Sequence, residues 1–203
     1  MQTNSLSINS RIKKAAVFLA FLFLIALTLS TSESHASSDT LSDSDQKSLE
    51  IAFALLENSL DAESELKWLI VFKKLTFHGP AERVEVVMKK IQKASSARSK
   101  ELQTMRKLAP SVTGAPPPSP MGDAIEAAAQ EAGTEELLFS SGVFNIRFLF
   151  LQAQATRMIS VVAQQAAKVD PNGKRSQWLS DVSDQFEGYR DDLVEIAKLC
   201  AIK

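Results

Sequence analysis

Apolar side chains recur at helical spacing along the C-terminal segment, and this periodicity constrains the fold more than any other feature of the chain. The line of apolar residues, three and four positions apart, is Leu179, Val182, Phe186, Tyr189, Leu193, Ile196 and Cys200. Acidic residues fall mostly off this line. Because so sustained an apolar stripe needs another helix to pack against, the segment predicts one helix of a bundle.

A second periodic segment covers residues 144–169. Its apolar line is Phe144, Phe148, Leu151, Ala155, Met158, Val162, Ala166 and Val169. Arginines and amides, Gln152 among them, fall on the other faces and would be costly in hydrocarbon. We therefore expect a core helix of a water-soluble bundle rather than a membrane span. The "DPNG" sequence at 170–173 predicts a turn, so this helix and the next should form an antiparallel hairpin.

The segment before them predicts another helical hairpin. The first helix should begin near Ser44 or Asp45, both good N-cap residues, and end at "HGP" (78–80). Its apolar line changes phase around "DAESE" (61–65). The second helix should run from residue 81 to about residue 108, where Pro110 follows.

The two hairpins are joined by a crossover connection at 110–142, which contains the proline run "PPPSP" (116–120). The connection is long enough to cross a helix of about 40 Å, so the helices that it joins can run parallel. One long crossover is the ferritin-like arrangement of a four-helix bundle. The sequence therefore predicts an all-α, ferritin-like four-helix bundle in residues 46–203, after a flexible segment at 37–45. The proline run fits a plain loop better than a ligand for a proline-binding domain.

The N-terminus resembles a secretory signal peptide. A basic cluster at 11–14 precedes an uncharged apolar run at 15–29, and Ser34 and Ala36 then occupy the −3 and −1 positions of a cleavage site. We expect cleavage after Ala36, which would remove residues 1–36 and leave a secreted or periplasmic protein with no membrane span. The alternative is an uncleaved anchor that tethers the same domain outside the cytoplasm.

The stretches "SGVFNIRFLFLQAQAT" and "WLSDVSDQFEGYRDDLVEIAKL" resemble the C-terminal half of an exported bacterial helical family, catalogued as domain of unknown function 4142 and described as ferritin-like. The first half, with "ELKWLIVFKKL" and "ERVEVVMKKIQKASSARSKELQTM", is also similar to that family. The family's Phe-Asp-x-x-Tyr-Leu pattern and following glutamine match Phe144, Asn145, Phe148, Leu149 and Gln152. Thr156 stands where the family has a histidine, and "KASSARSKEL" lacks the histidine of the family's second helix. The resemblance therefore implies the fold and export but no metal role.

Residue chemistry offers little for catalysis or cofactor binding. Beyond the signal peptide the only histidine is His78, at a helix end, and no Glu-x-x-His motif exists, so we expect no metal site and no cofactor. The single cysteine, Cys200, leaves an intermolecular disulfide open but excludes an intramolecular one. The net charge of −1 gives no reason to expect nucleic acid as a partner.

Two inward arginines are the remaining candidates. Arg98 and Arg157 lie near the apolar lines, and we expect them to pair with carboxylates such as Glu63 or Glu65. The function favoured by the sequence is a non-enzymatic exported bundle that acts by binding a protein partner or as a structural or stress-related component of the cell envelope. Two alternatives stay open: a ferritin-like metal-dependent oxidase or metal carrier, and a secreted effector or ligand. The sequence does not fix the oligomeric state.

Overall fold

The computed structural model describes residues 42–76, 81–113 and 144–201, and every regular element in these residues is an α-helix. The helices are α2 (Asp43–Ser64), α3 (Leu66–Thr76), α4 (Glu82–Met105), α6 (Phe144–Val169) and α7 (Gly173–Ala201). The prediction of an all-α helical bundle is confirmed for this part of the chain. The predicted signal peptide with its cleavage site at Ala36, residues 37–41, His78 and most of the crossover connection lie outside the described residues.

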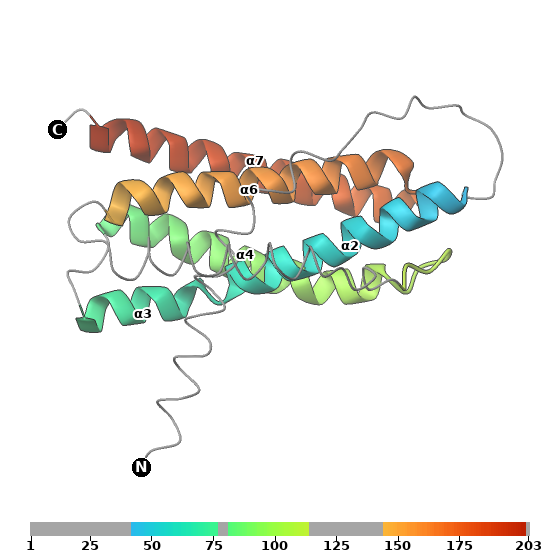
Figure 1. Cartoon of the computed structure of the whole chain (residues 1–203), viewed down its shortest axis with the longest axis horizontal. Coiled ribbons are helices and arrows are strands. Elements are labelled where there is room, and N and C mark those ends of the chain that lie inside the picture. The colour runs from blue at the N-terminus through green and yellow to red at the C-terminus, as the bar shows by residue number, and fades with distance from the viewer. Residues whose placement is uncertain (1–41, 77–80, 114–143, 202–203) are drawn as a thin grey trace, which may run out of the picture.

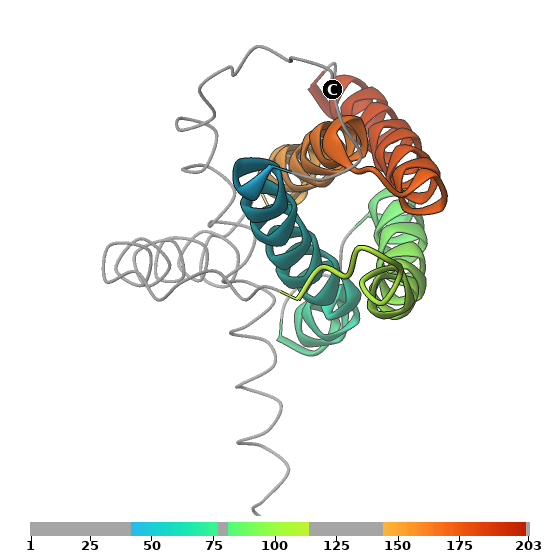
Figure 2. The same ribbon diagram turned by 90° about the vertical axis from the view of Figure 1, so that its right-hand side faces the viewer.

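Four helices surround a common core. Viewed along the bundle, α2, α6, α7 and α4 follow one another around a ring, and each packs against its two neighbours (Figure 2). α3 continues from the end of α2 and packs on α4 (Figure 1). Within the two hairpins α2 runs antiparallel to α4 and α6 antiparallel to α7, as the short connections predict.

α4 and α6 run in the same direction (Figure 1). At one end of the bundle the backbone N–H of Ala81, just before α4, donates to the Asn145 side chain at the start of α6 (3.2 Å). At the other end the Gln46 amide, near the start of α2, donates to the Ser111 carbonyl beyond the end of α4 (3.4 Å). Neighbours around the ring are therefore all antiparallel, and the parallel pairs lie on its diagonals.

The first predicted helix is in fact two helices. It begins at Asp43, with Ser42 as the N-cap residue whose hydroxyl accepts from the Asp45 N–H (3.1 Å), slightly earlier than expected. It is interrupted at Glu65, within the segment where the apolar line changes phase. Two tight i→i−3 hydrogen bonds, from Glu65 to Ala62 and from Trp68 to Glu65, form the break.

The apolar line of α6 is rotated relative to the sequence prediction. Val169 is 40% exposed, and Leu151 and Met158 are only partly buried. The buried residues of α6 are instead Phe148, Leu149, Gln152, Ala155, Thr156, Ile159, Ser160, Val162, Ala163 and Ala166. They pack toward α2 and α7, so the segment is a core helix, as expected. None of the helices within the described residues has the length and apolarity that a membrane span requires.

A buried ion pair closes the end of the bundle where α7 begins. Arg175 is fully buried and binds both carboxylate oxygens of Asp170, at 2.5 and 2.8 Å. A further guanidinium nitrogen donates to the carbonyls of Leu108 (3.0 Å) and Pro110 (2.7 Å) beyond α4, next to the cis Ala109–Pro110 bond. The guanidinium also lies over the ring of Phe53, 5.7 Å from its centroid. One side chain thus joins α2, the α4 terminus and the α6–α7 turn.

We predict that Arg175→Met lowers the free energy of unfolding by about 3–5 kcal/mol, because it leaves the buried Asp170 carboxylate without its cation. Urea denaturation monitored by circular dichroism measures the change. The neighbouring exposed residue provides a matched control, and Lys174→Met should change stability by less than about 0.5 kcal/mol. The double variant Asp170→Asn/Arg175→Met should be more stable than Arg175→Met alone. Equal losses for Arg175→Met and Lys174→Met would contradict this role.

Candidate functional site

A carboxyl group lies inside the bundle, on the last turn of α2. Glu63 continues the core line of α2, which is Leu49, Phe53, Leu56 and Leu60 at spacings of three and four. Its side chain is 2% exposed, so the packing of the apolar line carries the carboxyl into the core. α2 ends one residue later, the chain breaks at Glu65, and α3 begins with the buried Leu66.

The partner of this carboxyl comes from α6. The side-chain N–H of Gln152, which is fully buried, donates to Glu63 Oε2. Gln152 lies on the true core line of α6, four residues after Phe148 and three before Ala155. One turn later the buried hydroxyl of Thr156 donates to the Gln152 carbonyl (3.0 Å). Gln152 and Thr156 thus form the α6 side of the site.

Burial raises the pKa of the Glu63 carboxyl from 4.5 to about 8, and the hydrogen bond from Gln152 lowers it by less than burial raises it. The pKa shift has no contribution from a charged neighbour. The carboxyl therefore carries its proton at neutral pH. It is an acid held neutral by an apolar core, an arrangement that is characteristic of functional sites although not restricted to them.

The same level of the bundle contains polar atoms without partners. Gln92 of α4 donates to the Ser64 carbonyl (3.2 Å), and Ser99 donates to the Asp61 carboxylate (2.5 Å), so the α4 turn between them lies beside the end of α2. Ser95, on this turn, is fully buried. Its hydroxyl and the Gln152 side-chain oxygen form no hydrogen bond with the described residues. The layer around Glu63 is consequently under-satisfied, in contrast to the Arg175 ion pair.

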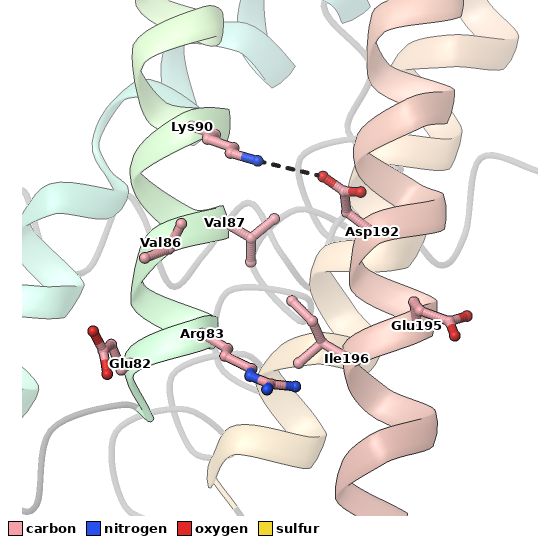
Figure 3. Close-up of a pocket in the computed structure, with 8 residues that line it drawn as sticks. All are labelled: Glu82, Arg83, Val86, Val87, Lys90, Asp192, Glu195 and Ile196. Atoms are coloured by element: carbon pink, nitrogen blue, oxygen red, sulfur yellow. Dashed lines mark ion pairs between the residues drawn. The ribbon is translucent and has the colours of Figure 1, made fainter.

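A second feature is an open surface groove between α4 and α7, with a volume of about 540 Å³. Figure 3 shows its lining residues: Glu82, Arg83, Val86, Val87, Lys90, Asp192, Glu195 and Ile196. Its base is apolar. Lys90 of α4 and Asp192 of α7 face each other across it at 3.8 Å, and Val86 is 50% exposed. The α4 wall carries Arg83 and Lys90, whereas the α7 wall carries two carboxylates.

The prediction that Arg98 and Arg157 pair with Glu63 or Glu65 is wrong. Arg98 is partly buried, but it binds Gln185 (2.8 Å) and Glu101 (2.8 Å). Arg157 is half exposed and pairs with Glu187 at 2.9 Å. Neither reaches Glu63 or Glu65, because both guanidinium groups extend toward α7 or along their own helix.

The remaining candidate residues give no additional site. Within residues 42–76, 81–113 and 144–201, no three His, Cys, Asp or Glu side chains come together in a way that could hold a metal ion. The backbone of Cys200 belongs to α7, but its side chain lies outside the described part of the structure. Comparisons with protein-family models, with curated proteins and with solved structures found no match. We therefore infer function from the groove and the buried carboxyl.

We predict that Glu63→Gln removes a specific pH dependence of stability. The folded carboxyl holds its proton up to about pH 8 and the unfolded one only to about 4.5, so wild-type stability falls as the pH rises through this interval and is level above it. The stability advantage of Glu63→Gln over wild type should grow by on the order of 5 kcal/mol across this range. Urea denaturation at several pH values measures it.

The control for this measurement is Glu195→Gln, the same substitution at a position on α7 whose side chain is 68% exposed. It should leave the pH profile of wild type unchanged. A profile for Glu63→Gln that runs parallel to that of wild type would show that Glu63 ionises normally in the folded state.

Proposed function

We propose that this chain is an exported helical-bundle protein that acts by binding a protein partner rather than by catalysis. The leader-like sequence at 1–36 supports export, and the resemblance to an exported helical family agrees with it. The parallel directions of α4 and α6 support a ferritin-like helix order with a single long crossover.

The observation that carries the binding proposal is the groove between α4 and α7. It has an apolar base, the basic Arg83 and Lys90 along α4 with Glu82 at the start of that helix, and two carboxylates on α7 (Figure 3). Arg83 is exposed and forms no ion pair with the described residues. A groove with these properties suits an amphipathic helix of a partner protein that inserts two or three apolar side chains. Such a helix would carry acidic residues on the edge facing α4 and basic residues on the edge facing α7.

The mass of the protein recovered from its own host tests export. We predict that the extracytoplasmic fraction contains a species that begins at Ser37, because cleavage after Ala36 fits the small-residue rule of signal peptidase. Intact-mass spectrometry reports the cleavage directly and also detects a dimer through Cys200. A full-length chain confined to the cytosol would contradict export.

Site-directed photo-crosslinking tests the groove. We predict that a benzoylphenylalanine in place of Val86, in the groove, captures a partner peptide whose sequence is an amphipathic helix with the stated charges. The control position is Val71 on α3, which is similarly exposed (46%) and lies outside the groove. Mass spectrometry of the crosslinked peptide identifies it.

A synthetic copy of the captured peptide provides the quantitative measurement. Its affinity should fall roughly tenfold with Val86→Asp, which places a charge on the apolar base, and should stay unchanged with Val71→Asp. Capture of equal yield at positions 86 and 71, or capture of this chain alone, would overturn the proposal of a partner helix.

A further inference from the structure

The junction of α2 and α3 has the features of a conformational switch. The last turn of α2 carries Glu63 into the core. The helix is then interrupted at Glu65, and the chain continues as α3. A break formed by i→i−3 bonds is a natural hinge, because it already lacks the regular helical hydrogen bonds. Within the part of the chain that the structure describes, the Glu63 side chain forms one hydrogen bond, which it accepts from Gln152 across the α2–α6 interface, here called the seam. The end of α2 is thus held to α6 by apolar packing and by one polar contact.

We propose that Glu63 is a proton-controlled latch: its protonated carboxyl holds the end of α2 against α6, and its ionisation opens this seam at the hinge. This inference goes beyond the proposed partner binding and does not rest on it.

The surroundings of Glu63 leave an ionised carboxylate without compensation. The carboxylate would accept one hydrogen bond, from the side-chain N–H of Gln152. It would also lie in the last turn of α2, where the negative end of the helix dipole disfavours a negative charge. The carboxylate would stay in a core whose other polar atoms, on Ser95 and Gln152, are themselves unsatisfied. Water is the best available partner for the charge, and the seam must open for water to reach it.

Charged and titratable groups on the packed helices do not supply a counter-charge. On α2 the Asp61 carboxylate accepts from Ser99, and on α3 Lys67 is exposed and lies over Trp68. The other groups on this part of the bundle are exposed or engaged with one another: Lys93 and Arg98 on α4, Arg147 and Arg157 on α6, and Glu187, Tyr189 and Arg190 on α7. Glu65 at the break differs, because one of its carboxylate oxygens is buried without a hydrogen-bond partner among the described residues. Glu65 is partly buried and of the same sign as Glu63, so it adds no cation.

The seam of α2 and α6 is less extensively packed than the interface within either hairpin. α6 and α7 form the most extensively packed pair, and α2 pairs chiefly with α4. Opening therefore moves the end of α2, with α3, away from an intact α6–α7 hairpin. The buried Arg175 ion pair contacts α2 at Phe53, in the middle of the helix, and would keep that part of α2 in place.

Hydrogen exchange of the purified protein tests the latch, with rates expressed as protection factors so that the intrinsic pH dependence is removed. Opening exposes a carboxyl with a pKa near 4.5, whereas the closed one has a pKa of about 8. The protection of amides at the end of α2 and in the first half of α6 should therefore fall roughly 30-fold between about pH 6.5 and about pH 9, and level off above pH 8. Amides in the middle of α7 exchange through global unfolding, which also exposes Glu63, so their protection should fall by the same factor but stay higher than that of the α2 amides at every pH.

Variants separate the latch from general alkaline loosening. Glu63→Gln should make α2 protection independent of pH, and Glu195→Gln should behave as wild type. Gln152→Leu removes the hydrogen bond that lowers the pKa of Glu63, so the plateau should move to higher pH. A pH-dependent loss that persists in Glu63→Gln, or equal protection of the α2 and α7 amides at every pH, would overturn the proposal.

A measurement on wild type covers the case in which Glu63→Gln does not fold. The side-chain carbon resonance of Glu63 should titrate near pH 8 under folding conditions, coincident with the plateau in protection. A titration midpoint below about pH 6 would also overturn the latch.

Discussion

The burial of one continuous apolar line on each helix is the constraint from which the rest of the structure follows. Residues spaced three and four apart share a face, so packing that face encloses every residue on it, polar or apolar. Each long helix has at least one polar residue on its line: Glu63 on α2, Ser95 on α4, Gln152 on α6 and Arg175 on α7. These four side chains are buried because of their positions, and each needs a partner from another part of the bundle.

The bundle meets this requirement differently at its two polar levels. Arg175 has a bidentate carboxylate and two backbone carbonyls, all in direct contact, so its burial fixes how the hairpin turn meets the end of α4. At the other level Glu63 is neutral and has one amide N–H. A neutral acid costs less to bury than a carboxylate, and it can change state without breaking a fully satisfied network. The first level gives rigidity, whereas the second allows a response to pH.

The sequence was sufficient for the helices and their hairpins, because periodicity, "HGP" and "DPNG" are local signals. It was insufficient for Gln152, which was assigned to an outer face on its chemical type although it fits the spacing between Phe148 and Ala155. The predicted partners of Arg98 and Arg157 were wrong because the choice of partner depends on the rotation of each helix about its axis. One sequence does not report how α2 and α6, far apart along the chain, are rotated toward each other.

The four helix–helix interfaces around the ring, its seams, differ in how they are connected along the chain. Two of them, α2–α4 and α6–α7, lie within hairpins, where a short connection limits relative motion. The other two, α2–α6 and α4–α7, lie between hairpins, and they hold the Glu63 carboxyl and the surface groove respectively. α2 packs on α4 and α6 packs on α7, so both of these seams join one packed pair of helices to the other. The two features from which function is inferred, the buried carboxyl and the groove, thus both lie where one packed pair of helices meets the other.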